Sequence, residues 1–311
     1  MFTPGPASLS EANIKNLDPA FGRGDKFYSV TERNVLSKIK KISGHNKIIA
    51  TQGSGSTVLE MVSLNFLRGN ILIVSTGYYS ERLYNLSLFA KKSHKYIKKV
   101  TKVDWKNLDS VKNKYDWIWA CYTETSCGFK LSIKELKKLS IRTKSKLAID
   151  ATASFGLENN HNLADVVSFS SCKGLLGLTG AGFICYNLEP KNKVNSFVLS
   201  LDNAKNKKMT GPYHSIQSLE LILKNYSQFK KSVIANKKKS LKRFKEYLIY
   251  PKKNQPLLCT YVECKIKGVS TKVILYKPRI KLSGSVICHL GEAHLADKAR
   301  GKILDYLKVD E

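Results

Sequence analysis

The sequence predicts an α/β protein built around a mostly parallel β-sheet. Short runs of apolar, β-branched and aromatic residues alternate with segments whose apolar residues recur at helical spacing. The short runs are uniformly apolar, which is typical of parallel strands that are covered by helices on both faces. With 311 residues, the chain is long enough for one large domain and a smaller one.

The order of these segments predicts the elements along the chain. Strands are predicted at 46–51, 70–76, 115–122, 146–151, 164–171 and 180–187, with helices at 56–67, 79–91 and 132–143. From about 214 a helical pattern continues through a Lys-rich helix to about 248; short β-like runs at 257–266 and 272–276 and a final helix near 293–307 follow. Ligands in such folds bind beyond the carboxyl ends of the strands, so the loops after residues 51, 76, 122, 150 and 171 should converge.

We therefore expect three parts: an N-terminal arm at 1–15, a large domain at 16–228 and a small C-terminal domain at 229–311. No uncharged apolar run reaches the length of a membrane span, and the N-terminus lacks the pattern of a signal peptide. The seven cysteines include no CxxC pair, and several lie in apolar runs, which indicates reduced thiols. These features predict a cytoplasmic protein.

The charge of the chain is strongly positive. The net charge is +29, and the 53 basic residues comprise eight arginines and 45 lysines. The lysines are spread along the chain without a recognised nucleic-acid motif, so we expect a solvated surface and no nucleic-acid partner. The same field favours small anionic substrates. His289, Glu292 and His294 lack the spacing of metal ligands on one helical face, and we expect no metal.

Four strand-end loops carry side chains with complementary chemistry. "QGSGSTVLE" (52–60) places glycine and hydroxyl residues at a helix start, where free N–H groups favour an anion. Asp150 ends an apolar strand, and an aspartate buried there needs a partner. "STGYYSERL" (75–83) offers aromatic rings, and "CYTETSCGF" (121–129) adds hydroxyls. Each feature alone is also compatible with an ordinary turn, helix cap or packing contact.

Lys173 connects these four loops. It is the only charged residue in "SFSSCKGLLGLTGAGF" (168–183), just after a predicted buried strand. A lysine beside an anion-binding turn, an aromatic ring and a buried carboxylate is the set that pyridoxal phosphate requires. The lysine forms a Schiff base with the cofactor, and the carboxylate keeps the ring nitrogen protonated. The sequence therefore predicts a pyridoxal phosphate enzyme.

The same segments resemble a known family. The chain is similar to the class V aminotransferases of fold type I, and within them to the 2-aminoethylphosphonate:pyruvate transaminases. The resemblance runs from "FTPGPASLSE" (2–11) through the four loops and the lysine segment to "MTGPYHSIQSLELI" (209–222), and returns weakly at "HLGEAHLAD" (289–297). It covers about two thirds of the chain. It implies a large domain with a seven-stranded type of sheet and a small C-terminal α/β domain, shortened here between 248 and 275.

The resemblance also implies roles for individual residues. Lys173 would be the Schiff-base lysine and general base, and Asp150 the partner of the ring nitrogen. Tyr79 would stack on the ring, and Thr125 would reach the ring oxygen or its neighbourhood. Ser54, Gly55 and Ser56 would hold the phosphate. Thr210 matches a position that binds the phosphate from the partner subunit, which implies a homodimer with shared active sites.

The implied reaction is a ping-pong transfer of an amino group between 2-aminoethylphosphonate and pyruvate, or between alanine and phosphonoacetaldehyde in reverse. One departure affects the substrate. Val286 stands where the family carries an arginine that binds the substrate carboxylate, and Arg279 is the nearest arginine in sequence. The alternatives are an alanine- or serine-glyoxylate (pyruvate) type of class V transaminase and a degenerate relative without turnover.

Overall fold

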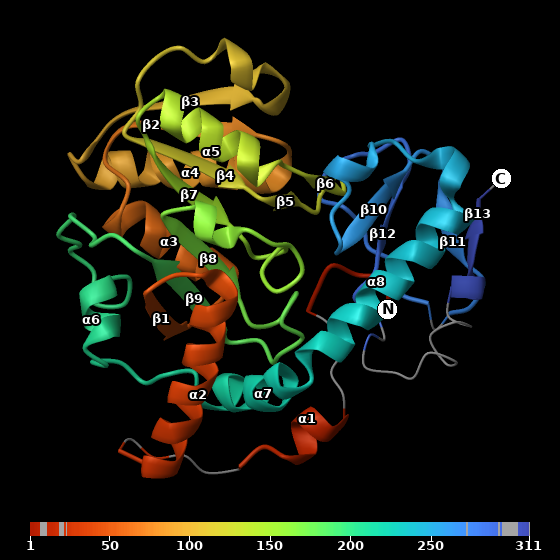
Figure 1. Cartoon of the computed structure of the whole chain (residues 1–311), viewed down its shortest axis with the longest axis horizontal. Coiled ribbons are helices and arrows are strands. Elements are labelled where there is room, and N and C mark those ends of the chain that lie inside the picture. Colours follow the sequence, from red (N-terminus) through yellow and green to blue (C-terminus); the bar gives the residue numbers. More distant parts are fainter. Residues whose placement is uncertain are drawn as a thin grey trace.

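The central feature of the structure, a computed structural model, is a seven-stranded sheet in the order β1-β9-β8-β7-β4-β2-β3 (Figure 1). The described residues are 1–6, 11–18, 22, 24–271, 273–291, 293 and 304–310. The strands are β1 (Lys47–Gln52), β2 (Gly69–Ser75), β3 (Ile97–Asp104), β4 (Trp117–Cys121), β7 (Lys146–Asp150), β8 (Val166–Ser170) and β9 (Ala181–Tyr186). Only β9 runs antiparallel to its neighbours β1 and β8. The predicted mostly parallel α/β fold is confirmed.

Helices cover both faces of this sheet, which explains why its strands are uniformly apolar. The helices α2 (Lys26–Ser43), α5 (Ile133–Arg142) and α7 (Tyr213–Lys224) contribute to one hydrophobic cluster, and α3 (Gly55–Asn65) and α4 (Tyr78–Ser93) contribute to the other. Alternate residues of β2 point into each: Leu72 faces the first cluster, and Ile71 the second. Every strand buried in this way needs apolar side chains on both sides.

Six strands of the sheet were predicted within two residues of their observed bounds, but β3 and α2 were not predicted. β3 is the strand at one edge of the sheet, and it carries Lys98, Lys99 and Lys102. Charged side chains on an edge discourage pairing with another chain, and they also hide the apolar signal of a strand. Smaller elements were not predicted either: α1 (Glu11–Lys15), η1 (Trp105–Ser110), η2 (His161–Leu163), α6 (Leu201–Lys205), and the hairpin of β5 (Thr123–Glu124) and β6 (Phe129–Lys130).

Beyond α8 (Tyr226–Arg243), which leads away from α7, lies the C-terminal region, residues 245–310 (Figure 1). It contains two small antiparallel pairs: β10 (Cys259–Val262) with β12 (Ser285–Cys288), and β11 (Ile266–Gly268) with β13 (Leu307–Val309). Its described residues also form the 3₁₀ turns η3 (Lys245–Tyr247), η4 (Lys252–Asn254) and η5 (Leu304–Tyr306). The C-terminal region packs into the same cluster as the large sheet through Leu258, directly before β10, and Val286 of β12.

Two predicted elements of the C-terminal region differ from the structure, and a third lies mostly outside the described residues. The predicted helix to about 248 is too long, because α8 ends at Arg243. The predicted strand at 272–276 is wrong for the described residues 273–276, which contain only an isolated bridge between Leu275 and Phe2. Most of the predicted helix near 293–307 lies outside the described residues, as do Glu292 and His294.

The first residues of the chain pack against the C-terminal region. Phe2 is buried with Val262 and Ile287. Its N–H donates to the Ile274 carbonyl at 2.8 Å, and its own carbonyl accepts from the Tyr276 N–H at 3.1 Å. All seven cysteines are free thiols, as predicted. None of the helices in the described ranges is long and apolar enough to cross a membrane.

Candidate active site

A cavity of about 270 Å³, here called the Lys173 cavity, lies at the carboxyl edge of the large sheet. The loops that follow β1, β2, β4, β7 and β8 converge on it, as the sequence predicted. Its lining comprises Gly5, Ser54, Gly55, Ser56, Leu59, Tyr79, Arg82, Cys121, Thr123, Thr125, Asp150, Thr152, Ala153, Ser170, Cys172, Lys173 and Arg279. The structure therefore brings all the predicted site residues to one cavity except Thr210.

Lys173 lies in the loop after β8 and is partly buried. Its Nζ is 5.3 Å from the centroid of the Tyr79 ring. The N-terminal residues pack against its stem: a Cβ added to Gly5 would lie 2.7 Å from the Lys173 Cγ. Gly5 also has a φ of 128°, which side chains rarely allow. The arm and the Tyr79 ring thus confine the amine to the cavity.

Asp150 is the last residue of β7 and is 5% exposed. Its Oδ1 accepts the Thr152 N–H at 2.8 Å. Burial raises the pKa of Asp150, while its contact with Thr152 and the charges of Lys173 and Arg82 act in the opposite direction. A buried carboxylate of this kind is suited to a cationic N–H donor, such as a protonated ring nitrogen.

The turn at Ser54 opens the positive end of α3 toward the cavity. Ser54 caps the helix by accepting the Thr57 N–H at 3.4 Å, and its own N–H donates to Thr57 Oγ1 at 3.1 Å. A Cβ on Gly55 would lie 3.0 Å from Thr152 Cγ2, so glycine keeps this approach open. The neighbouring Thr152 Oγ1 is buried without a hydrogen-bond partner among the described residues. Free helix N–H groups and an unbonded hydroxyl are suited to an anion.

Glu124 holds Tyr79 in place and was not singled out by the sequence analysis. Its carboxylate is fully buried and accepts the N–H groups of Tyr79 and Ser80, each at 3.0 Å, at the first turn of α4. It also accepts the Ser126 hydroxyl. The available signal was that Glu124 is the only charged residue in "CYTETSCGF", the same kind of signal that identified Lys173.

Arg279 reaches the mouth of the Lys173 cavity from the C-terminal region. Val286, at the position of the family's carboxylate-binding arginine, supplies no charge. Arg279 is exposed, and its Nη1 donates to the Tyr78 hydroxyl at 3.4 Å. Hydrogen bonds from Arg279 and then Arg82 lower the pKa of Tyr78. Val286 is buried in β12 opposite Tyr261. Arg279 therefore brings a guanidinium to the cavity, although its position in the sequence differs from that of the family's arginine.

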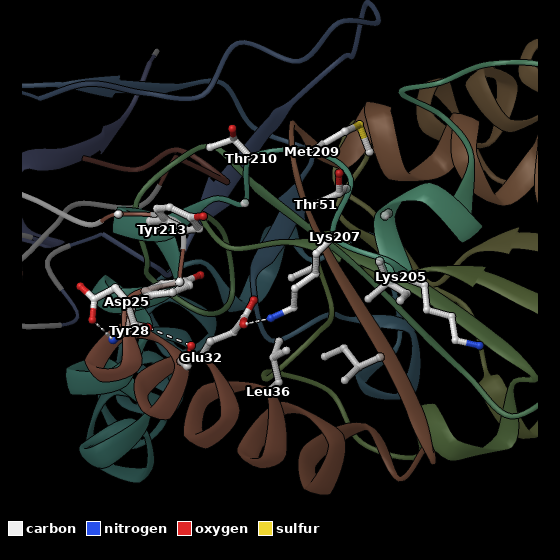
Figure 2. Close-up of a pocket in the computed structure, with 18 residues that line it drawn as sticks. Asp25, Tyr28, Glu32, Leu36, Thr51, Lys205, Lys207, Met209, Thr210 and Tyr213 are labelled. Atoms are coloured by element: carbon white, nitrogen blue, oxygen red, sulfur yellow. Dashed lines mark hydrogen bonds and ion pairs between the residues drawn. The ribbon is translucent and has the colours of Figure 1, made fainter.

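Thr125 is buried and lines the Lys173 cavity, whereas Thr210 lies elsewhere. Thr210 is exposed at the rim of a second cavity of about 290 Å³. Figure 2 shows this cavity between α2 and the segment around Thr210, with Lys207 paired to Glu32 on its wall. Within one chain, the structure does not bring Thr210 to Lys173.

The residues of the Lys173 cavity fit pyridoxal phosphate. They supply an amine, a buried carboxylate for the ring nitrogen, an aromatic ring beside the amine, and an anion-binding helix start. A large, mostly parallel seven-stranded sheet that presents these groups at its carboxyl edge is the fold of the type I pyridoxal phosphate transferases.

Comparisons with known proteins agree with this fold. The chain is 23% identical over 197 residues to the 2-aminoethylphosphonate–pyruvate transaminases of two Pseudomonas aeruginosa strains. The aligned segment covers 59% of this chain and 53% of theirs, so the chain spans about half the length of the curated relatives it matches. No family model matches the sequence.

Solved structures resemble the chain over more of its length. An aspartate aminotransferase from Thermus thermophilus superposes with a TM-score of 0.80 at 16% identity, with coverage of 98% of this chain and 97% of that one. A ureidoglycine–glyoxylate aminotransferase from Bacillus subtilis gives 0.76 at 14% identity, with 97% and 90% coverage. A phosphoserine aminotransferase with bound pyridoxal phosphate from Trichomonas vaginalis gives 0.67 at 13% identity, with 83% and 82% coverage. The predicted resemblance is confirmed at the level of the fold.

Proposed function

We propose that this protein is a pyridoxal phosphate-dependent aminotransferase. The observation that carries the proposal is the placement of the Lys173 amine 5.3 Å from the Tyr79 ring centroid, in the cavity that the buried Asp150 carboxylate also lines. A lysine, a carboxylate and an aromatic ring in this arrangement suit a planar heterocyclic aldehyde. Aminotransferases among the structural neighbours support the same activity.

Each residue has a defined task in this reaction. When bound, pyridoxal phosphate supplies an electron sink for the bond that breaks at the substrate carbon. Lys173 would bind the cofactor covalently and, once the substrate amine has displaced it, its Nζ would take the proton from the substrate carbon that bears the amino group. Asp150 would accept the ring N–H, Tyr79 would pack on the ring, and the turn at 54–56 would bind the phosphate. Thr125, at the wall of the cavity, would lie close to the oxygen on the cofactor ring.

The proposed substrates are 2-aminoethylphosphonate and pyruvate, with alanine and phosphonoacetaldehyde as the products. The curated relatives with this activity support the choice, as does the positive charge at the cavity mouth. Arg279 would bind the phosphonate of the donor or the carboxylate of the acceptor, because a guanidinium recognises both planar and tetrahedral anions. Tyr78 would share this anion through the hydroxyl that faces Arg279.

An alanine- or serine-glyoxylate type of transaminase is the second candidate. The superposition with a glyoxylate-using aminotransferase favours it, because such an enzyme needs only a carboxylate-binding cation, which Arg279 could supply. The two candidates differ in the distal group of the amine. A comparison of 2-aminoethylphosphonate with alanine and serine as donors separates them.

We further propose that the enzyme acts in the cytoplasm as a homodimer. The free state of all seven cysteines supports a reducing compartment. Thr210 is exposed and away from the Lys173 cavity of its own chain, where it would be available to the phosphate site of a second copy. The shared site would then be complete only in the dimer, and a Thr210→Ala variant would weaken cofactor binding without changing the dimer mass in light scattering.

The absorbance spectrum of the purified protein tests the proposed function. With pyridoxal phosphate bound to Lys173, we expect a yellow protein that bleaches when 2-aminoethylphosphonate is added without a keto acid. Borohydride reduction followed by peptide mass spectrometry should place the cofactor on the peptide that contains Lys173. A yellow protein that only alanine or serine bleaches supports the second candidate. A protein that does not bind the cofactor contradicts both and leaves a degenerate relative.

A further inference from the structure

Arg82 lines the Lys173 cavity beside the start of α3. It lies three residues after Tyr79 on α4, so both side chains project from the same face of the helix. Its Nη1 donates to the Ser56 hydroxyl at 2.9 Å, and its Cζ is 5.0 Å from the centroid of the Tyr79 ring. The guanidinium therefore lies between the ring and the start of α3.

The charge of Arg82 has no acidic partner in the described ranges of the chain. Its close contacts there are the Ser56 hydroxyl and the Tyr78 and Tyr79 rings. The adjacent carboxylate, Glu81, pairs instead with Lys102 at 3.1 Å. A guanidinium that contacts only the neutral hydroxyls of Ser56 and Tyr78 retains most of its five N–H donors for a ligand.

The anion that fits this place is a dianionic phosphate group. The start of α3 supplies only a partial positive charge, roughly half an elementary charge. The Gly55 approach and the unbonded Thr152 hydroxyl leave room and a donor beside it. Thr123, which is 2% exposed and lines the same cavity, also has a hydroxyl without a partner among the described residues. A guanidinium adds a full charge and paired donors that match phosphate oxygens.

We propose that Arg82 binds the phosphate of the cofactor together with the turn at 54–56. This inference rests on the proposed function and adds to it the cation that neutralises the phosphate. The Ser56 hydroxyl orients the guanidinium, and the Tyr79 ring beneath it links phosphate binding to the position of the cofactor ring. Arg279, at the mouth of the same cavity, remains for the substrate anion.

Titration of the apoprotein with pyridoxal phosphate and with pyridoxal, which lacks the phosphate, tests the inference. We expect Arg82→Gln to weaken pyridoxal phosphate binding roughly 10- to 100-fold, the range for a hydrogen-bonded charged group, and to leave pyridoxal within about twofold. Arg82→Lys should restore part of the loss. The matched control Arg279→Gln removes a charge at the same cavity and should leave the ratio of the two affinities unchanged.

The outcomes separate this inference from the proposed function. If the unchanged protein binds pyridoxal phosphate at Lys173 but Arg82→Gln binds it equally well, the Arg82 inference fails and the aminotransferase proposal stands. Equal weakening of pyridoxal and pyridoxal phosphate also overturns it, because the residue would then act on the ring or the fold. If the cofactor-saturated variant instead loses affinity only for 2-aminoethylphosphonate, Arg82 binds the substrate phosphonate. If the unchanged protein binds neither compound, both proposals fail.

Discussion

The carboxyl edge of the large sheet and the C-terminal region contribute to one cavity in different ways. Asp150, Lys173 and the turn at 54–56 follow directly from the ends of β7, β8 and β1, three strands of the seven-stranded sheet. The C-terminal region contributes Arg279 from a loop, near strands that pair only two by two. This comparison suggests that the sheet edge determines the chemistry, whereas the C-terminal region determines the substrate.

Replacement of Lys173 is the strongest test of the sheet-edge half of this comparison. We expect Lys173→Ala to lower the rate of amino transfer at least about 10⁴-fold, because both the covalent attachment and the proton transfer are lost. The variant should still bind pyridoxal phosphate, since Asp150, Tyr79 and the helix start remain. Single-turnover spectroscopy with the cofactor added in excess measures both properties. Substantial activity in this variant would contradict the assignment of Lys173.

Replacement of Glu124 should destabilise the sheet edge without removing a group that takes part in the reaction. We expect Glu124→Ala to lower the free energy of unfolding by roughly 3 kcal/mol, because the buried N–H groups of Tyr79 and Ser80 lose their acceptor. Glu124→Gln keeps one acceptor oxygen and should cost less than half as much. Urea unfolding of the apoprotein measures the effect. An unchanged midpoint in Glu124→Ala would mean that α4 is held by its apolar face alone.

The pH dependence of stability tests whether the two regions unfold together. Burial lowers the pKa of His161, beneath the large sheet, and of His289, in the C-terminal region, each to about 3. Between pH 6.5, the unfolded pKa, and about pH 3 the unfolded chain binds more protons than the folded chain. The stability that the neutral histidines contribute is therefore fully present above pH 6.5 and is lost as the pH falls. From pH 7 to pH 5 each histidine should lower the free energy of unfolding by roughly 2 kcal/mol.

The hydrophobic cluster of the large sheet includes Leu258 and Val286 of the C-terminal region. We therefore expect one unfolding transition, whose free energy depends on the protonation of both histidines. Urea unfolding at pH 5 and pH 7 measures this dependence. His161→Gln and His289→Gln should each abolish the part of the stability loss between these pH values that is due to the replaced histidine. Two separate transitions, each altered by only one of the variants, would show that the C-terminal region is an independent unit.

Replacement of Arg279 should give the smallest effect and is specific to the C-terminal half. We expect Arg279→Gln to raise KM for the anionic substrate about tenfold with kcat nearly unchanged, because a charged hydrogen bond to the bound anion is lost. Lys277→Gln, which removes an exposed charge two residues away, serves as the control for the general field. A fall in kcat instead of a rise in KM would place Arg279 in the chemical step.

The difference between the two regions also sets how much could be predicted from the sequence. The buried strands were predictable because covered parallel strands are apolar throughout, and Lys173 and Asp150 stood out against that background. Arg82 did not stand out, since a charged residue one turn along an amphipathic helix is ordinary, and only the fold brings it to Ser56. The position of Arg279 depends on how an irregular loop packs against Tyr78, for which the sequence carries no periodic signal.

The pairing of Phe2 with the segment around Tyr276 has a consequence for the order in which the protein is made. The arm that packs against Lys173 through Gly5 leaves the ribosome before its partners Ile274 and Tyr276, which follow only after the large sheet has been synthesised. At typical elongation rates that delay is on the order of 15 to 55 seconds. The wall around Lys173 is therefore completed only after the sheet that carries the lysine has had time to form.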